Sequence, residues 1–332
     1  MNIVRREFLR GGAAVLGLAA DRGIAWAQSY PARPVRVIVP FSLGGPPDLM
    51  ARLIAHRLTE IFKQPFVVEN VIGAGGNTGI VAAAKAPPDG YTIAVISTAF
   101  FANPTLHGWV PYDPIRDFAP ISLLAAVPNV LMVHPSVPAK SVRELIALIR
   151  LNPGKYGYAH PDGGSSPHLA GEIFKQRFSL DIPTVPYEST TAAVTATVAG
   201  RTPIAWTAVA PALSDIKTGR LRALGVTSAK RIAALPEVPT MTEVGAPDME
   251  TETLTGVLAP ARTPKTIVDR LRREISGVLG HWDVRRELVA LGFEPVESTP
   301  EEFAVRIAKE VARWRNLLRD ANIRTAPTTG VR

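Results

Sequence analysis

The sequence predicts an α/β fold with a largely parallel sheet, in a chain long enough for two domains. Short runs of β-branched and apolar residues at 35–39, 66–69 and 91–97 read as strands. The first two lead into loops rich in glycine or proline, and apolar residues at helical spacing follow each loop. Repeated strand–loop–helix units are typical of parallel sheets. With 332 residues, the chain exceeds the usual size of one domain, about 100–200 residues.

The first 27 residues read as an export signal and not as part of the fold. Arg5 and Arg6 precede an apolar stretch at 11–20, and the sequence Ala-Trp-Ala at 25–27 fits a cleavage site. The apolar stretch is too short to span a bilayer, which takes about 20 residues. The arginine pair favours a twin-arginine signal over residues 1–27, with an ordinary secretory signal as the alternative. We therefore expect cleavage near Ala27 and a mature protein in the periplasm.

Charge and composition narrow the class of partner. The chain has a net charge of +8, but its lysines and arginines form no run of the kind that marks a nucleic-acid or lipid patch. A basic solvated surface explains this pattern and would weakly attract anions, so we expect no nucleic-acid partner. The absence of cysteine excludes disulfides, thiolate metal sites and a cysteine nucleophile.

Local signals place the elements that follow the first strand. The loop at 41–47 ends in two prolines that suit the first turn of a helix, and Asp48 suits the positive end of that helix. Apolar residues continue at helical spacing to Phe62, and a helix at 80–86 follows the glycine loop at 73–79. We also expect strands within 121–134 and at 156–159, 204–207 and 221–226, and helices that begin near 141, 166, 263 and 299.

Helix-capping residues support three of these helix starts. Ser141 and Glu144 have capping-box spacing, and the sequence Thr-Pro-Glu-Glu at 299–302 starts the last helix. Near 166, Ser166 fits the N-cap position and the proline after it fits the first helical position. The last helix keeps one apolar face, made of Phe303, Ile307, Val311, Trp314 and Leu318.

Three loops combine glycine with a strand before them and a helix after them. They contain Gly44-Gly45, Gly75-Gly76-Asn77 and Gly164-Ser165-Ser166. Bare glycine backbone lets N–H groups approach an anion at a helix N-terminus, and ligands of open α/β sheets bind at the carboxyl ends of the strands. The sequence therefore predicts an anion-binding cleft where the loops converge. The alternative for each loop is a tight strand–helix turn with no ligand.

Signatures of enzymes and metal sites are missing from the sequence. The glycine loop at 73–79 departs from G-x-G-x-x-G, and no acidic residue follows at the distance a ribose needs. There is no G-x-S-x-G, no H-E-x-x-H and no calcium loop, and the spacing of His160, Asp162 and His168 matches no standard metal site. We therefore expect no catalytic residues, no cofactor and no metal. The rival is a hydrolase that uses Ser165 or Ser166 with His168.

Longer motifs are similar to those of the Bug family, the substrate-binding proteins of tripartite tricarboxylate transporters. The matching strings include YPARPVRVIVPFSLGGPPDLMARLIA, VVENVIGAGGNTG, AKAPPDGYT and IKTGRLRALGVTS, and the resemblance spans essentially the whole mature chain. It implies a two-lobed periplasmic binding protein fold, type II-like, with the ligand cleft between the lobes. Lobe 1 would comprise 30–128 plus 257–332, and lobe 2 would comprise 129–256. It also implies a monomer that hands a small carboxylate to membrane permease subunits.

In this family the two lobe-1 loops grip a carboxylate through backbone groups and ordered water, and they match 41–48 and 73–79 here. Departures concentrate in lobe 2, at 160–162, 186–189 and 201–204, so the group at the far end of the ligand stays open. Trp206, Phe100 and Phe101 would either line a slot for an apolar or aromatic ligand or pack in the core. The residues expected to bind the ligand are Phe41, Ser42, Gly44, Gly45, Asp48, Gly75, Gly76, Asn77, Thr98, Ala99, Gly164, Ser165, Ser166, His168, Tyr187, Trp206 and Thr207.

The ligand class expected from the sequence is a di- or tricarboxylate or an aromatic carboxylate. Besides the hydrolase, a second rival is an exported sensor subunit that presents its ligand to a signalling partner.

Overall fold

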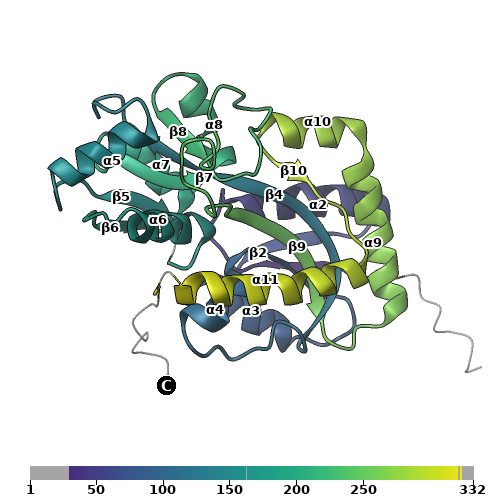
Figure 1. Cartoon of the computed structure of the whole chain (residues 1–332). Coiled ribbons are helices and arrows are strands. Elements are labelled where there is room, and N and C mark those ends of the chain that lie inside the picture. The colour runs from purple at the N-terminus through teal and green to yellow at the C-terminus, as the bar shows by residue number, and fades with distance from the viewer. Residues whose placement is uncertain (1–29, 162, 321, 324–332) are drawn as a thin grey trace, which may run out of the picture.

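The computed structural model describes residues 30–161, 163–320 and 322–323 (Figure 1). The predicted signal at 1–27 lies outside these residues. Across the described part of the chain, no helix has both the length and the apolar character needed to cross a membrane.

Lobe 1 is built on the sheet that contains the first strand. Its strands are β1 (Val35–Val39), β2 (Phe66–Asn70), β3 (Thr92–Ile96), β9 (Glu252–Pro260), β10 (Glu294–Pro295) and the first part of β4 (Phe118–Val133). Its helices are α2 (Pro46–Phe62), α3 (Asn77–Ala84), α4 (Ala99–Leu106), α9 (Lys265–Gly280), α10 (Trp282–Ala290) and α11 (Pro300–Asp320), and a 3-10 turn, η1 (Ala74–Gly76), precedes α3.

Lobe 2 is built around the last part of β4. Its other strands are β5 (Tyr158–Pro161), β6 (Thr184–Tyr187), β7 (Ile204–Ala208) and β8 (Arg222–Val226). Its helices are α5 (Val142–Leu151), α6 (Ser166–Arg177), α7 (Thr190–Val198) and α8 (Val209–Lys217). The long strand β4 joins the two groups, and Figure 1 shows it curving from one to the other beside β9. The lobe limits expected from the sequence stay predictions, but β4 changes partners between Pro128, paired with β9, and Asn129, paired with β7.

The sheet is mixed, so the expectation of a largely parallel sheet needs correction. Pairing is parallel for β1 with β2 and β3, and for β5 with β6 and β7. It is antiparallel for β9 with β3, and for β4 with β7, β8, β9 and β10. The parallel units come from local strand–loop–helix repeats, whereas β4 and β9 are the crossovers that carry the chain between the lobes. The α/β class and the two-lobed architecture are confirmed.

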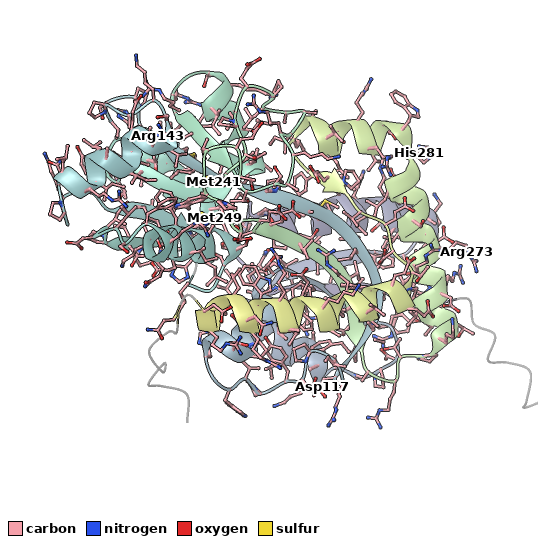
Figure 2. All side chains as sticks on the ribbon, viewed as in Figure 1. Asp117, Arg143, Met241, Met249, Arg273 and His281 are labelled. Atoms are coloured by element: carbon pink, nitrogen blue, oxygen red, sulfur yellow. The ribbon has the colours of Figure 1, made fainter. Side chains whose placement is uncertain are left out.

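Helices cover both faces of each lobe. An apolar cluster under α3, α4 and α11 continues over one face of the sheet into lobe 2, beneath α5 and α6. A second cluster fills the space between the lobe-1 sheet and α2, α9 and α10, and a third lies beneath α7 and α8. The predicted apolar face of α11 is buried, and Gly256 of β9 makes room for the ring of Phe303, which would clash with a Cβ there. Polar side chains such as Arg143, Arg273 and His281 lie at the periphery (Figure 2).

Most predicted elements are present, with shifts at the glycine loops. The helix expected at 80–86 begins earlier, at Asn77. The N-cap of α6 is Ser165 and not Ser166, because the backbone of Ser165 is extended and its Oγ accepts a hydrogen bond from the His168 amide at 3.4 Å. Ser166 is therefore the first helical residue.

Candidate functional site

A cavity lies between the lobes, where the loop after β1 faces the first turns of α6 and α7. Its volume is about 40 Å³. At about 10–15 Å³ for each water, this volume holds on the order of three water molecules. The lining residues are Phe41, Ser42, Gly45, Pro46, Pro47, Ser97 and Thr253 from lobe 1, and Pro161, Ser165, Ser166, Pro167, Thr190 and Ala208 from lobe 2.

Glycine backbones bring the two lobes into contact around this cavity. A Cβ on Gly44 of lobe 1 would lie 3.0 Å from the Thr191 hydroxyl of lobe 2. A Cβ on Gly164 of lobe 2 would lie 3.0 Å from the Asn103 side chain of lobe 1. Both glycines have positive φ, +76° and +85°, which side chains disfavour. The lobes are therefore closed on each other, and these two positions have little room for a side chain.

Four helix N-termini converge on the cavity. The first turns of α2, α6 and α7 line it, and so does the N-cap of α8, at Gly45, Ser166, Thr190 and Ala208. Each N-terminus carries roughly half a positive charge, and no lining side chain is ionisable. The cavity therefore favours an anion through backbone dipoles and without a charged side chain.

The two sides of the cavity differ in their hydrogen-bond donors. On the lobe-1 side, α2 begins with Pro46 and Pro47, which have no N–H groups. The first residues of α6 and α7 are Ser166 and Thr190, whose backbone N–H groups have no partner inside their own helices. Lobe 2 therefore has more donors to offer an anion than α2 has.

Asp48, one of the residues expected to bind the ligand, holds its own loop together. Its carboxylate accepts hydrogen bonds from the Gly44 amide at 3.0 Å, from Asn70 at 2.9 Å and from Arg52 at 3.0 Å. Burial alone would raise the pKa of Asp48, but these bonds outweigh it and hold the pKa below its usual value. Asn70 also donates to the Phe41 carbonyl at 3.0 Å, so the loop is tied to β2.

The second glycine loop lies behind the lining. Gly75, Gly76 and Asn77 are outside the set of lining residues, and a Cβ on Gly76 would lie 2.6 Å from the ring of Phe41. The Gly76 amide donates to the Gly73 carbonyl at 2.9 Å. Asn103 of α4 donates to the Gly75 carbonyl and to the Asn77 side chain, both at 2.9 Å. The loop thus supports Phe41 from behind.

His168 packs beside the cavity as a neutral side chain. Its Nδ1 accepts a hydrogen bond from the Gly164 amide at 3.1 Å, and its ring lies 4.4 Å from that of His160. Burial, together with the proximity of His160, lowers the pKa of His168 to about 3. Burial also lowers the pKa of His160. Neither ring therefore supplies positive charge to the site at neutral pH.

Two predicted hydroxyl-bearing residues are engaged within the protein. The Thr98 hydroxyl donates to the Glu252 carbonyl at 2.7 Å, which fixes the start of α4, and hence Ala99, against β9. The Tyr187 hydroxyl bonds the Thr202 hydroxyl at 2.7 Å. Both residues lie outside the lining of the cavity.

The remaining predicted residues lie inside lobe 2. The Thr207 hydroxyl donates to the Ala208 carbonyl at 3.1 Å. Trp206 is 1% exposed, with its ring 5.7 Å from that of Phe174. Phe100 and Phe101 of lobe 1 are likewise fully buried in an apolar cluster. Of the two interpretations left open for these three aromatic residues, core packing is what the structure shows.

Sequence reasoning missed several lining residues, chiefly Ser97, Pro161, Thr190, Ala208 and Thr253. The run Ser-Thr-Thr at 189–191, directly before the apolar residues of α7, was a usable helix-start signal. Ala208 carried no such signal, because alanine is a poor N-cap.

Comparisons with known proteins agree with this geometry. The family model described as "Tripartite tricarboxylate transporter family receptor" matches residues 50–323. The structure of the periplasmic binding protein BugD has a TM-score of 0.85 and 31% identity, and the match covers 90% of this chain and 100% of that one. An R. palustris protein solved with adipate has a TM-score of 0.85 and 35% identity, and the match covers 89% of this chain and 99% of that one. The protein MatC from Rhodopseudomonas palustris, solved with bound malate, has a TM-score of 0.82 and 30% identity, and the match covers 87% of this chain and 100% of that one.

Proposed function

Because the chain belongs to the tripartite tricarboxylate transporter receptor family, we propose that it captures a small carboxylate between its lobes in the periplasm. It then presents that ligand to the membrane permease subunits of such a transporter. The observation that carries the proposal is the cavity itself, where four helix N-termini meet and no lining side chain is charged. Such an arrangement stabilises an anion without a fixed counter-charge.

The ligand class follows from the lining and from the similar structures. Adipate and malate, found with two of those proteins, are both aliphatic dicarboxylates. In this chain Trp206 is committed to the core of lobe 2, while Phe41 is the aromatic residue on the lining. We therefore favour an aliphatic di- or tricarboxylate over an aromatic one.

Binding without chemistry fits the side chains around the cleft. A serine hydrolase needs a serine hydroxyl that donates to a histidine base. Here the Ser165 hydroxyl donates to the Pro161 carbonyl at 2.8 Å, and the Nδ1 of His168 accepts from the Gly164 amide. This pairing leaves the hydrolase interpretation without a nucleophile–base contact at Ser165.

The proposal includes export through the segment at 1–27. A reporter fused after residue 30 should reach the periplasm by the twin-arginine route, because Arg5 and Arg6 are paired ahead of an apolar stretch. Replacing both arginines by lysine should block export. Unchanged export of the double variant would assign the segment to the ordinary secretory route.

The central experiment is a ligand screen on protein that begins at Gln28. Thermal shift and titration calorimetry would test acetate, benzoate, L-malate, adipate and citrate. A ligand at 100 times its Kd should stabilise the protein by about 2.7 kcal/mol. The proposal fails if none of the di- and tricarboxylates binds, or if a neutral solute binds more tightly than all of them.

A further inference from the structure

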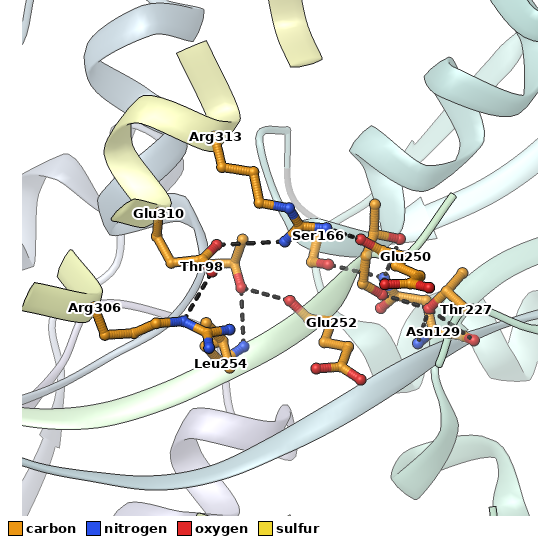
Figure 3. A network of polar contacts seen from close by, with 11 residues as sticks. Thr98, Asn129, Ser166, Thr227, Glu250, Glu252, Leu254, Arg306, Glu310 and Arg313 are labelled. Atoms are coloured by element: carbon orange, nitrogen blue, oxygen red, sulfur yellow. Dashed lines mark hydrogen bonds and ion pairs between the residues drawn. The ribbon is translucent and has the colours of Figure 1, made fainter. Parts of the chain in front are cut away.

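Asn129 lies at the point of β4 where the strand changes its partners. It is fully buried. Its backbone N–H donates to the Thr227 hydroxyl at 2.9 Å, and its backbone carbonyl accepts from the Thr227 backbone N–H at 2.9 Å. The Thr227 hydroxyl in turn donates to the Thr251 carbonyl, just before β9. These bonds join the two crossovers between the lobes (Figure 3).

The side-chain amide of Asn129 reaches from this junction to the cavity. Its Nδ2 is 2.8 Å from the Thr251 carbonyl oxygen and 2.8 Å from the Ser166 hydroxyl oxygen. Figure 3 labels Asn129 and Ser166 and marks the contacts with dashed lines. A carbonyl oxygen only accepts, so the atom facing Thr251 must be the nitrogen and not the amide oxygen. The amide orientation is thereby fixed, and Asn129 donates to Ser166.

The Ser166 hydroxyl is left with its own hydrogen to donate. A hydroxyl has one hydrogen, and its oxygen is already engaged by Asn129. Within 30–161, 163–320 and 322–323, this hydroxyl has no hydrogen-bond partner besides Asn129. Ser166 is 2% exposed and lines the cavity at the first turn of α6. The cavity is therefore the place where a partner for this hydrogen would sit.

The neighbouring serine differs in the use of its hydrogen. The Ser165 hydroxyl gives its hydrogen to the Pro161 carbonyl at 2.8 Å and accepts from the His168 amide at 3.4 Å. It caps α6 and has no hydrogen left for a ligand, although it also lines the cavity. The two adjacent serines therefore differ in whether a hydrogen is left for a ligand.

We propose that Asn129 is a positioning residue that fixes the polarity of Ser166, so that Ser166 presents a donor and selects ligand groups that only accept. A carboxylate is such a group, so this inference rests on the proposed function and extends it to one side chain. The side-chain amide of Asn129 also donates to the Thr251 carbonyl. The junction of the two crossovers therefore fixes which group of Asn129 faces Ser166.

A double-mutant cycle with titration calorimetry tests the proposal, with the tightest binder among acetate, benzoate, L-malate, adipate and citrate as the probe. Ser166→Ala should weaken binding about tenfold, which is about 1.4 kcal/mol. Asn129→Ala should give a similar loss alone, but less than about twofold in the Ser166→Ala background, because it acts through that hydroxyl. Ser228→Ala is the matched control and should stay within about threefold of wild type, because this buried serine of lobe 2 lies outside the lining and gives its hydrogen to the Lys230 carbonyl at 2.7 Å.

Selectivity between ligands separates an effect on the polarity of the Ser166 hydroxyl from an effect on folding. For a dicarboxylate probe, the preference over its monoamide should fall in Ser166→Ala and in Asn129→Ala, and stay unchanged in Ser228→Ala. Retained affinity and selectivity in Ser166→Ala would overturn the inference while leaving the proposed function intact. Failure of every carboxylate to bind wild type would instead overturn the proposed function, and the inference with it.

If Asn129→Ala does not fold, neutron diffraction of the wild-type complex with the same probe decides the question. Deuterium density on the line from the Ser166 oxygen to the bound carboxylate supports the proposal. A deuterium bonded to the Ser166 oxygen and directed at Asn129, with no amide deuterium of Asn129 directed at that oxygen, overturns it.

Discussion

The two walls of the cleft are built on different principles. On the lobe-1 side the loop after β1 satisfies its polar groups internally, through Asp48 and Asn70, and α2 starts with two prolines. On the lobe-2 side three helices start at the lining, with N–H groups at Ser166 and Thr190 outside their own helical bonding. Lobe 1 therefore gives the cleft its shape, and the helix starts of lobe 2 give it donors that α2 lacks.

This difference predicts whether a substitution on each wall changes stability or affinity. Substitutions that remove the internal polar contacts of the lobe-1 loop should act first on stability, because these contacts hold the loop. Substitutions at the lobe-2 helix starts should act first on affinity, because donors there face the cavity. Single substitutions on each wall can test that contrast.

The largest effect is expected at Asp48. Asp48→Ala removes a buried carboxylate that accepts three hydrogen bonds, one of them from Arg52, and should lower the free energy of unfolding by about 2–3 kcal/mol. Since the folded pKa is depressed, this contribution is present above the unfolded pKa of about 4 and is lost as the pH falls through the folded pKa. Urea titrations at pH 7 and pH 3 would measure it.

The control is an exposed ion pair in the same lobe. Glu69→Gln breaks the pair with Arg36, in which the side chains of Arg36 and Glu69 are 41% and 49% exposed. Exposed pairs contribute about 0–1 kcal/mol, so the loss should be much smaller. Equal losses at the two sites would contradict the structural role given to Asp48.

On the lobe-2 side, His168 should make stability depend on pH. Its folded pKa of about 3 lies below the unfolded value of about 6.5, so the unfolded chain binds more protons between these values. Stability should therefore fall by about 2 kcal/mol from this group as the pH drops from 7 to 5. His168→Asn keeps an acceptor for the Gly164 amide without titrating, so its unfolding free energy should change less over the same range. Identical slopes of unfolding free energy against pH in the wild type and in His168→Asn would refute the prediction.

Contact between the walls should govern closure at Gly44. Gly44→Ala adds a Cβ at a positive φ and 3.0 Å from Thr191 across the cleft. We expect at least tenfold weaker binding by calorimetry, about 1.4 kcal/mol, because the closed form is hindered. Gly108→Ala is the matched control, since Gly108 has a φ of +72° and a Cβ added there would meet no described atom within 4 Å. It should lower stability without changing affinity.

The contrast between the walls also explains what the sequence could predict. Helices such as α2 and α11 follow from apolar periodicity and end signals within a few residues, and both begin at the expected place. The antiparallel pairing of β4 with β9 joins residues more than 100 positions apart, for example Ala119 with Ala259. No local pattern encodes that pairing, so the sheet was predicted as more parallel than it is.

The candidate site was predicted in the same uneven way. Loops rich in glycine and proline are visible in the sequence, and Phe41, Ser42 and Gly45 do line the cavity. The donors of α7 and the role of Asn129 depend on tertiary contacts, since Asn129 lies within an apolar run that reads as plain strand. The N-cap of α6 is Ser165, one residue before the expected Ser166. Residue propensities do not distinguish between two adjacent serines at a helix start.

The smallest effect is expected at Arg52, which tests whether a cation contributes to binding. Arg52 is the basic residue next to the lobe-1 loop, and its side chain is 48% exposed and paired with Asp48 at 3.0 Å. If helix N-termini and Ser166 hold the anion, Arg52→Gln should leave affinity within about twofold, while stability falls modestly through Asp48. Calorimetry at low and high salt would measure this, because a contribution from an exposed cation is screened by salt. A large loss of affinity in Arg52→Gln, with Ser166→Ala binding normally, would move the anion site from the lobe-2 helix starts to a lobe-1 charge.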